Sequence, residues 1–132
     1  MIAKEVALAF VSAVNKHDLD ALASLMTDDH VFVDGLGTRV SGKDAMLAGW
    51  RAYFAMVPDY RVDIDTVIEG DGMVAMFGTA GGTFAPDSVI NLAKRWTTPA
   101  AWLVEVRSGK VAAWSVFADN LPMRRLMSIE PG

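Results

Sequence analysis

Residues 95–119 read RWTTPAAWLVEVRSGKVAAWSVFAD, and this stretch decides the fold. It predicts two β-strands joined by a hairpin at residues 107–110, because Ser-Gly between two alternating apolar runs is typical of a tight turn. Pro99 lies inside the first of these strands, and proline in a strand pattern indicates a bulge or an edge at that point.

The alternation in this hairpin separates two faces, and both carry apolar side chains. One set of faces holds Trp102, Val104, Trp114, Val116 and Ala118. The other set holds Leu103, Ala113 and Phe117, together with Glu105 and Arg107. Apolar residues on both faces indicate that each is at least partly covered. We expect one face to meet helices and the other to meet a second subunit.

The segment before the hairpin also has a period of two. Residues 60–67 alternate apolar with charged side chains, and residues 71–84 form a second strand pattern entered through an Asp-Gly turn. Residues 85–94 are expected to form a loop with a short helical turn.

The N-terminal part has helical periodicity instead. Residues 2–16 predict an amphipathic helix with Ile2, Val6, Phe10, Ala13 and Val14 on one side. Asp18 is the expected N-cap of a second helix, whose buried stripe is Leu19, Leu22, Leu25 and Met26. Residues 30–34 then predict a short strand, and Asp-Gly-Leu-Gly after it is typical of a turn.

A third helix is expected to begin at a capping box made by Ser41 and Asp44 and to end before Pro58. Its buried stripe would be Leu47, Trp50, Phe54 and Val57. Asp119 or Asn120 is expected to cap a last helix. Helices followed by a run of antiparallel strands indicate the α+β class.

Composition limits the classes of function. The 132 residues are 52% hydrophobic and 21% charged, which predicts one globular domain over residues 1–132. Scattered basic residues and a net charge of −4 argue against a nucleic-acid partner. The sequence has no cysteine, no run long enough to span a membrane and no signal-peptide pattern, so we expect a cytoplasmic protein. His17 and His30 lack ligand spacing, so we expect neither a metal nor a cofactor.

The strings VNKHDLDALASLMTDDHVFVDG and GKVAAWSVFADN, in this order of elements, resemble the SnoaL-like branch of the nuclear transport factor 2-like superfamily. That superfamily also includes ketosteroid isomerases and limonene epoxide hydrolases. The resemblance covers roughly residues 2–127. It implies a cystatin-like cone, in which N-terminal helices pack on a strongly bent antiparallel sheet around an apolar pocket, and it implies a homodimer.

The same resemblance places Asp34 at the catalytic base position of ketosteroid isomerase. Phe10 and Trp102 stand where that enzyme has its oxyanion donors, and neither residue donates from an oxygen. Loss of each such donor typically costs about 10²–10³-fold in rate, so isomerisation by that mechanism is not expected. Val116 stands where the epoxide hydrolases have an acidic residue. The SnoaL-like cyclases have their acidic residue in the later strands, and the nearest carboxylate in this sequence is Asp119.

Asp34 therefore has two interpretations: a turn aspartate, or an acid/base that assists an intramolecular ring closure. His30 and Phe32 share its strand and are expected to face the same pocket. The tryptophans divide between core and pocket wall, and Thr98 is the main polar candidate in the strands. The predicted ligand-binding residues are Phe10, His30, Phe32, Trp50, Phe54, Trp96, Thr98, Trp102, Trp114 and Val116.

The sequence thus predicts a protein with a pocket for a small apolar molecule. Catalysis, if present, would be that of a cofactor-free isomerase or polyketide-cyclase-like enzyme with Asp34 as its single acid/base. The alternatives are a non-catalytic protein that binds a small ligand and a dimerising interaction module with a filled pocket.

Overall fold

The computed structural model of the protein describes residues 2–128. The chain runs through four α-helices, six strands and one 3₁₀ turn within that range. In order they are α1 (Ala3–Asn15), α2 (Leu19–Leu25), β1 (Met26–Val33), β2 (Arg39–Ser41), α3 (Lys43–Met56), β3 (Arg61–Gly70), β4 (Met73–Thr83), η1 (Leu92–Lys94), β5 (Arg95–Arg107), β6 (Lys110–Ala118) and α4 (Leu121–Ser128).

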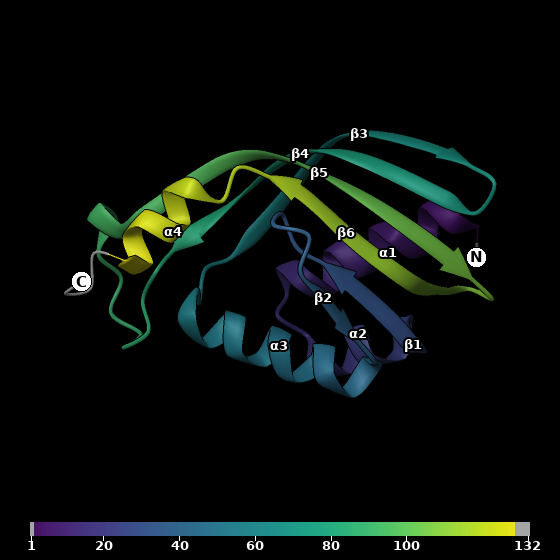
Figure 1. Ribbon diagram of the computed structural model, residues 1–132, viewed down its shortest axis with the longest axis horizontal. Coiled ribbons are helices and arrows are strands. Elements are labelled where there is room, and N and C mark those ends of the chain that lie inside the picture. The colour runs from purple at the N-terminus through teal and green to yellow at the C-terminus, as the bar shows by residue number, and fades with distance from the viewer. Residues whose placement is uncertain (1, 129–132) are drawn as a thin grey trace.

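The six strands form one curved sheet in the order β2–β1–β6–β5–β4–β3. Only the β1–β6 pair is parallel, and the other neighbours are antiparallel. The sheet arches over α1 and α3, as Figure 1 shows, and α1 packs across β3 to β6. This arrangement confirms the predicted α+β class with N-terminal helices on a strongly bent sheet.

The predicted hairpin and its two faces are present. The strands β5 and β6 turn at Ser108-Gly109, and Trp102 pairs with Val116 while Val104 pairs with Trp114. The side chains of Trp102, Val104 and Trp114 are buried under the arch, where each contributes about 1.5–3 kcal/mol to stability. On the outer face Leu103 and Phe117 stay 38% and 59% exposed. The core therefore lies on the concave side.

The start of α3 differs from the prediction. Ser41 is the last residue of β2 and pairs with Val31, so α3 begins one residue later than the predicted cap requires. Gly42 takes the N-cap position at φ 100°, with no side-chain capping bond, and Asp44 lies in the first turn. Glycine makes this abrupt change from strand to helix at little cost. The predicted capping box was wrong, whereas the helix end before Pro58 and the Asp18 cap of α2 are confirmed.

At Pro99 the sequence left a bulge or an edge open, and the structure has the edge. The register between β4 and β5 runs without interruption through the Thr79–Pro99 pair. Pairing between β5 and β6 begins one residue later, at Ala100 with Ala118. Pro99 therefore has a strand on one side only, which makes it a local edge where a missing N–H is tolerated.

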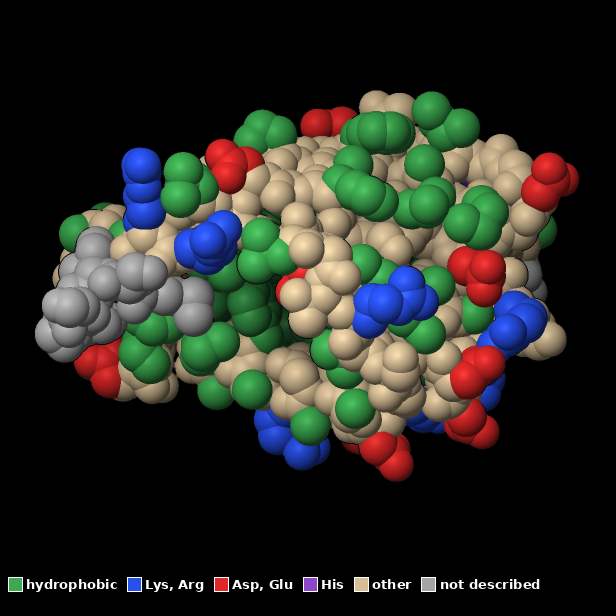
Figure 2. Space-filling view, in the orientation of Figure 1, with side chains coloured by type: hydrophobic (Ala, Val, Ile, Leu, Met, Phe, Trp, Pro, Cys, Tyr) green, Lys and Arg blue, Asp and Glu red, His purple; other side chains and the backbone are tan. Residues whose placement is uncertain are grey.

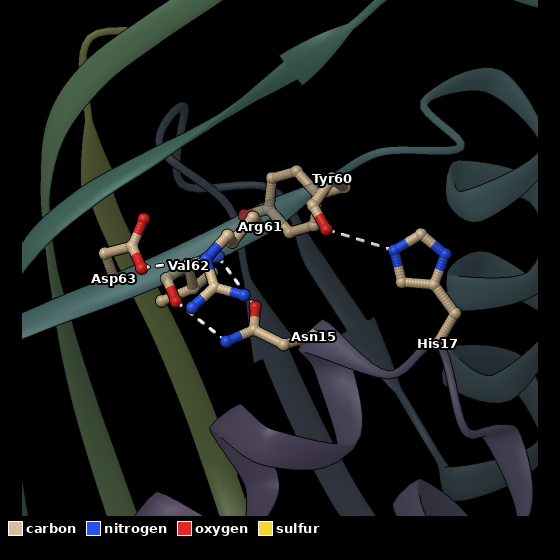
Figure 3. Close-up of polar contacts among 6 residues, drawn as sticks. All are labelled: Asn15, His17, Tyr60, Arg61, Val62 and Asp63. Atoms are coloured by element: carbon tan, nitrogen blue, oxygen red, sulfur yellow. Dashed lines mark hydrogen bonds and ion pairs between the residues drawn. The ribbon is translucent and has the colours of Figure 1, made fainter.

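Two side chains from the end of α1 hold the edge strand β3, as Figure 3 shows. The Asn15 amide donates to the Val62 carbonyl oxygen and accepts from the Val62 N–H, both at 2.8 Å, so it replaces the missing neighbouring strand. His17 Nε2 donates to the Tyr60 carbonyl oxygen at 3.0 Å. The inner-facing residues Tyr60 and Val62 are thereby fixed relative to α1.

Candidate functional site

A cavity of about 470 Å³ lies between the concave face of the sheet and the helices. Residues of α3, α4 and the β1–β2 turn line one side of it, and Figure 2 shows a hollow with hydrophobic walls at this place. The wall is made largely of aromatic side chains. Those predicted from the sequence that line it are Phe32, Trp50, Trp96, Trp102 and Trp114. Asp34, Thr98 and Val116 line it as well.

Three residues predicted for the site lie behind the wall. Phe10 is fully buried and packs on Trp114 with ring centroids 4.5 Å apart. Phe54 stacks on His17 at 4.1 Å and on Trp50 at 5.4 Å. Phe10 and Phe54 therefore support the aromatic wall from the core side.

His30 is the third residue behind the wall and is fully buried. Its Nδ1–H donates to the Val111 carbonyl oxygen at 2.8 Å, which leaves Nε2 as the unprotonated nitrogen. Nε2 has no partner among residues 2–128. Burial lowers the pKa of His30, although the bond to Val111 and the nearby Asp29 carboxylate oppose the shift. The structure thus places His30 as a neutral core residue.

Asp34 lies both in the β1–β2 turn and at the cavity. Its Oδ1 accepts from the backbone N–H groups of Leu36 and Thr38, both at 2.9 Å, which makes it the aspartate of the β1–β2 turn. The same side chain is half-buried and lines the cavity. No hydrogen bond from the described residues reaches Oδ2. One oxygen therefore holds the turn, and the other has no hydrogen-bond partner among residues 2–128.

Asp119 takes no part in the cavity wall. Its Oδ1 accepts from the Leu121 N–H at 2.9 Å and caps α4, while the side chain is exposed. The neighbouring Asn120 lines the cavity instead. The sequence predicted that one of these two residues caps the helix, but it did not indicate which side chain faces the cavity. That choice depends on how the end of β6 packs against the β1–β2 turn.

Two tyrosines complete the wall. Tyr53 and Tyr60 meet edge to face, with ring centroids 4.9 Å apart and planes at 87°. The Tyr53 hydroxyl donates to the Met123 sulfur at 3.2 Å. Burial raises the pKa of both phenols, so both are neutral donors at pH 7. Tyr60 was missed from the sequence, although its alternation with Val62 and Ile64 marked it as an inner-facing residue.

The described residues contain no group of three or more His, Cys, Asp or Glu side chains placed to hold a metal ion. No helix in this part of the chain is long and apolar enough to cross a bilayer. The polar chemistry of the cavity therefore comes from Asp34, Thr98, Asn120 and the two tyrosines, together with Arg124.

Comparison with solved structures shows close likeness in fold. A candidate SnoaL-like polyketide cyclase from Shewanella denitrificans OS-217 superposes with a TM-score of 0.82 at 16% identity, covering 97% of this chain and 98% of that one. IdmH, a candidate polyketide cyclase from Streptomyces antibioticus, gives 0.78 at 20% identity, with 96% and 98% covered. A cystatin-fold protein from Novosphingobium aromaticivorans gives 0.70 at 24% identity, with 89% and 98% covered.

These identities are low, so the likeness shows the shared fold alone. A search of curated proteins gave no significant match. The family model described as the SnoaL-like domain matches residues 7–114, which is most of the chain. The protein is therefore a member of the SnoaL-like domain family.

Proposed function

We propose that this protein binds an apolar cyclic or aromatic small molecule inside its cone. The observation that carries the proposal is the cavity of about 470 Å³ with an aromatic wall and few polar groups. Ligand pockets typically measure about 300–1,000 Å³ and have this composition. The cavity also disfavours the interaction module with a filled pocket, because the tryptophans leave a void of ligand size.

Substitution of Gly49 tests this proposal directly. Gly49 lies on α3 at the cavity wall, and a Cβ there meets only the end of the Met46 side chain, at 3.7 Å. Gly49→Trp should therefore fill the cavity without disturbing the helix. The matched control is Ala48→Trp, because Ala48 is exposed on α3 and does not line the cavity. Equilibrium dialysis with 2-acetonaphthone as the probe should show binding that only Gly49→Trp abolishes.

A wild-type protein that binds no such probe would contradict the proposal. Equal binding by both tryptophan variants would show that the probe occupies another site.

Our proposal for catalysis is a cofactor-free isomerase or cyclase with Asp34 as its acid/base. Support comes from Asp34, which lines the cavity and has an Oδ2 without a protein partner among residues 2–128, and from the fold shared with candidate polyketide cyclases. In a shape-determining pocket, orientation supplies much of the barrier reduction, and one acid/base completes the minimum set. A carboxylate at Oδ2 would remove a proton from the carbon next to a ligand carbonyl.

Proton exchange tests this step. The methyl protons of 2-acetonaphthone exchange with D₂O when a base removes them, and NMR measures the rate. The wild type should accelerate exchange and Asp34→Asn should abolish the acceleration, while Asp119→Asn, outside the cavity, should retain it. No acceleration by a wild type that binds the probe would favour the non-catalytic alternative, for which the Asx turn at Asp34 is the supporting observation.

We also propose that the protein forms a homodimer through the outer face of the sheet. Apolar side chains remain exposed there on three adjacent strands of the described chain: Phe77, Leu103 and Phe117. Contiguous exposed apolar area of this kind marks interaction sites. Sedimentation equilibrium should give twice the chain mass, and Phe117→Lys should shift the equilibrium to monomer.

A further inference from the structure

The Tyr60 hydroxyl is a polar group for which the protein supplies no partner. Tyr60 lines the cavity and is only 9% exposed. Its carbonyl oxygen accepts from His17, but no hydrogen bond joins its hydroxyl to any residue from 2 to 128. The fully buried side-chain nitrogen and oxygen atoms that lack a partner in residues 2–128 do not include this hydroxyl, so it is open to the cavity.

The neighbouring tyrosine shows the contrast. Tyr53 lines the same cavity, and its hydroxyl donates to the Met123 sulfur. The two rings touch, so they share one environment. Of these two hydroxyls, that of Tyr60 alone lacks a protein acceptor among residues 2–128.

Tyr60 is also held in place from several sides. Its ring packs on Tyr53 and, at 6.2 Å between centroids, on Trp96. Its backbone is fixed by the His17 hydrogen bond, and His17 in turn stacks flat on Phe54 (Figure 3 shows the bond). A donor held this way loses little conformational entropy when it binds an acceptor.

We propose that the Tyr60 hydroxyl donates a hydrogen bond to an acceptor oxygen of the bound ligand. The ligand is then an apolar ring compound with a carbonyl or similar oxygen at the end that reaches Tyr60. This inference rests on the proposed ligand-binding function of the cavity. It also supplies an O–H donor to the cavity, where Trp102 offers none from an oxygen.

The alternative partner of this hydroxyl is water, and the two cases differ in a measurable way. A ligand oxygen that displaces water keeps the hydrogen bond, whereas an apolar group of the same shape loses it. A site built to bond an oxygen therefore discriminates against the analogue that lacks it.

The test uses two probes of the same shape. In 2-acetonaphthone a carbonyl oxygen stands where 2-isopropenylnaphthalene has a methylene carbon. Binding of both probes to wild type, Tyr60→Phe and Tyr53→Phe is measured by equilibrium dialysis. Tyr60→Phe should lower the affinity for the ketone by about five-fold, as expected for the loss of one hydrogen bond. Binding of the hydrocarbon should be unchanged, and Tyr53→Phe should leave the preference for the ketone intact.

A carbonyl carbon labelled with ¹³C gives a second readout that a change in packing alone would not produce. Its resonance should move downfield in the wild-type complex and return upfield in Tyr60→Phe. Tyr60→Phe should also keep the stability of the wild type without ligand, because it removes no hydrogen bond to the protein.

Equal weakening of both probes, an unchanged ketone affinity or a lower melting temperature of Tyr60→Phe would each overturn the inference. Failure of both probes to bind the wild type would instead contradict the proposed function of the cavity.

Discussion

Replacing Gly78 with alanine should unfold the arch that creates the cavity. Gly78 lies on β4 opposite a bulge in β3, where the register shifts between Ile64 and Thr66. An alanine Cβ at Gly78 would overlap the Asp63 carbonyl oxygen and would lie 2.9 Å from the Asp63 carbonyl carbon and 3.0 Å from Ile64 Cα. All three are backbone atoms, so no side-chain rotation relieves the overlap.

The cost follows from this geometry. Overpacking against movable side chains typically costs about 1–3 kcal/mol, and a clash with backbone should reach or exceed the upper end. Relief requires the bulge to straighten, and bulges are what bend and twist a strand locally. We therefore expect Gly78→Ala to lower the free energy of unfolding by about 3 kcal/mol or more.

Urea denaturation followed by tryptophan fluorescence measures this loss. The matched control is Gly70→Ala on β3, where a Cβ meets nothing within 4 Å. That change should stay within about 0.5 kcal/mol of the wild type, as exposed substitutions usually do. A loss below about 1 kcal/mol for Gly78→Ala would refute the claim that close backbone approach at the bulge requires glycine.

Two further predictions concern stability. Burial lowers the pKa of His30, so below about pH 6.5 the unfolded state binds a proton that the folded state resists, and the free energy of unfolding falls as the pH drops. His30→Asn should reduce the difference between urea midpoints at pH 7.5 and pH 5; an equal difference in both proteins would exclude His30 as the cause. Asn15→Ala should cost about 1–3 kcal/mol and speed amide exchange at Val62, whereas Asn91→Ala should not change exchange there.

Local patterns were sufficient for most of the fold. The Asp18 cap, the Ser108-Gly109 turn and the burial of Trp102 and Trp114 follow from rules that act within one element or between neighbours. The error at Ser41 and the choice between bulge and edge at Pro99 have another origin. Each depends on where a partner strand begins or ends, which is decided by residues far along the chain.

The site was less predictable for the same reason. Strand alternation located Phe32, Trp102 and Trp114 on the inner face, but it does not tell a wall residue from a core residue. Phe10 faces the sheet from α1, yet Trp114 lies between it and the cavity, and this layering needs three dimensions. Strand alternation was enough to predict that Tyr60 faces inward. It could not predict that Asn120 lines the cavity.

The shape of the sheet connects these local features to the cavity. Asp34 follows β1 and Tyr60 precedes β3, and these two strands lie four positions apart in the sheet. In a flat sheet that separation is roughly 19 Å, beyond the length of a small ligand. The bend of the sheet brings Asp34 and Tyr60 to one cavity. The β3 bulge and the close backbone contact at Gly78 help to form the site because they are part of this bend.

The aromatic wall explains why the space under the arch stays open. A cavity lined by flexible aliphatic chains can shrink by rotamer changes, but this wall consists of rigid rings. Trp50 packs on Phe54 behind it, and Tyr60 packs on Trp96. To close the cavity, these rings would have to move apart. They would lose van der Waals contacts that the collapsed arrangement would not replace. The tryptophans therefore do more than add buried area: they hold apart the surfaces that enclose the cavity.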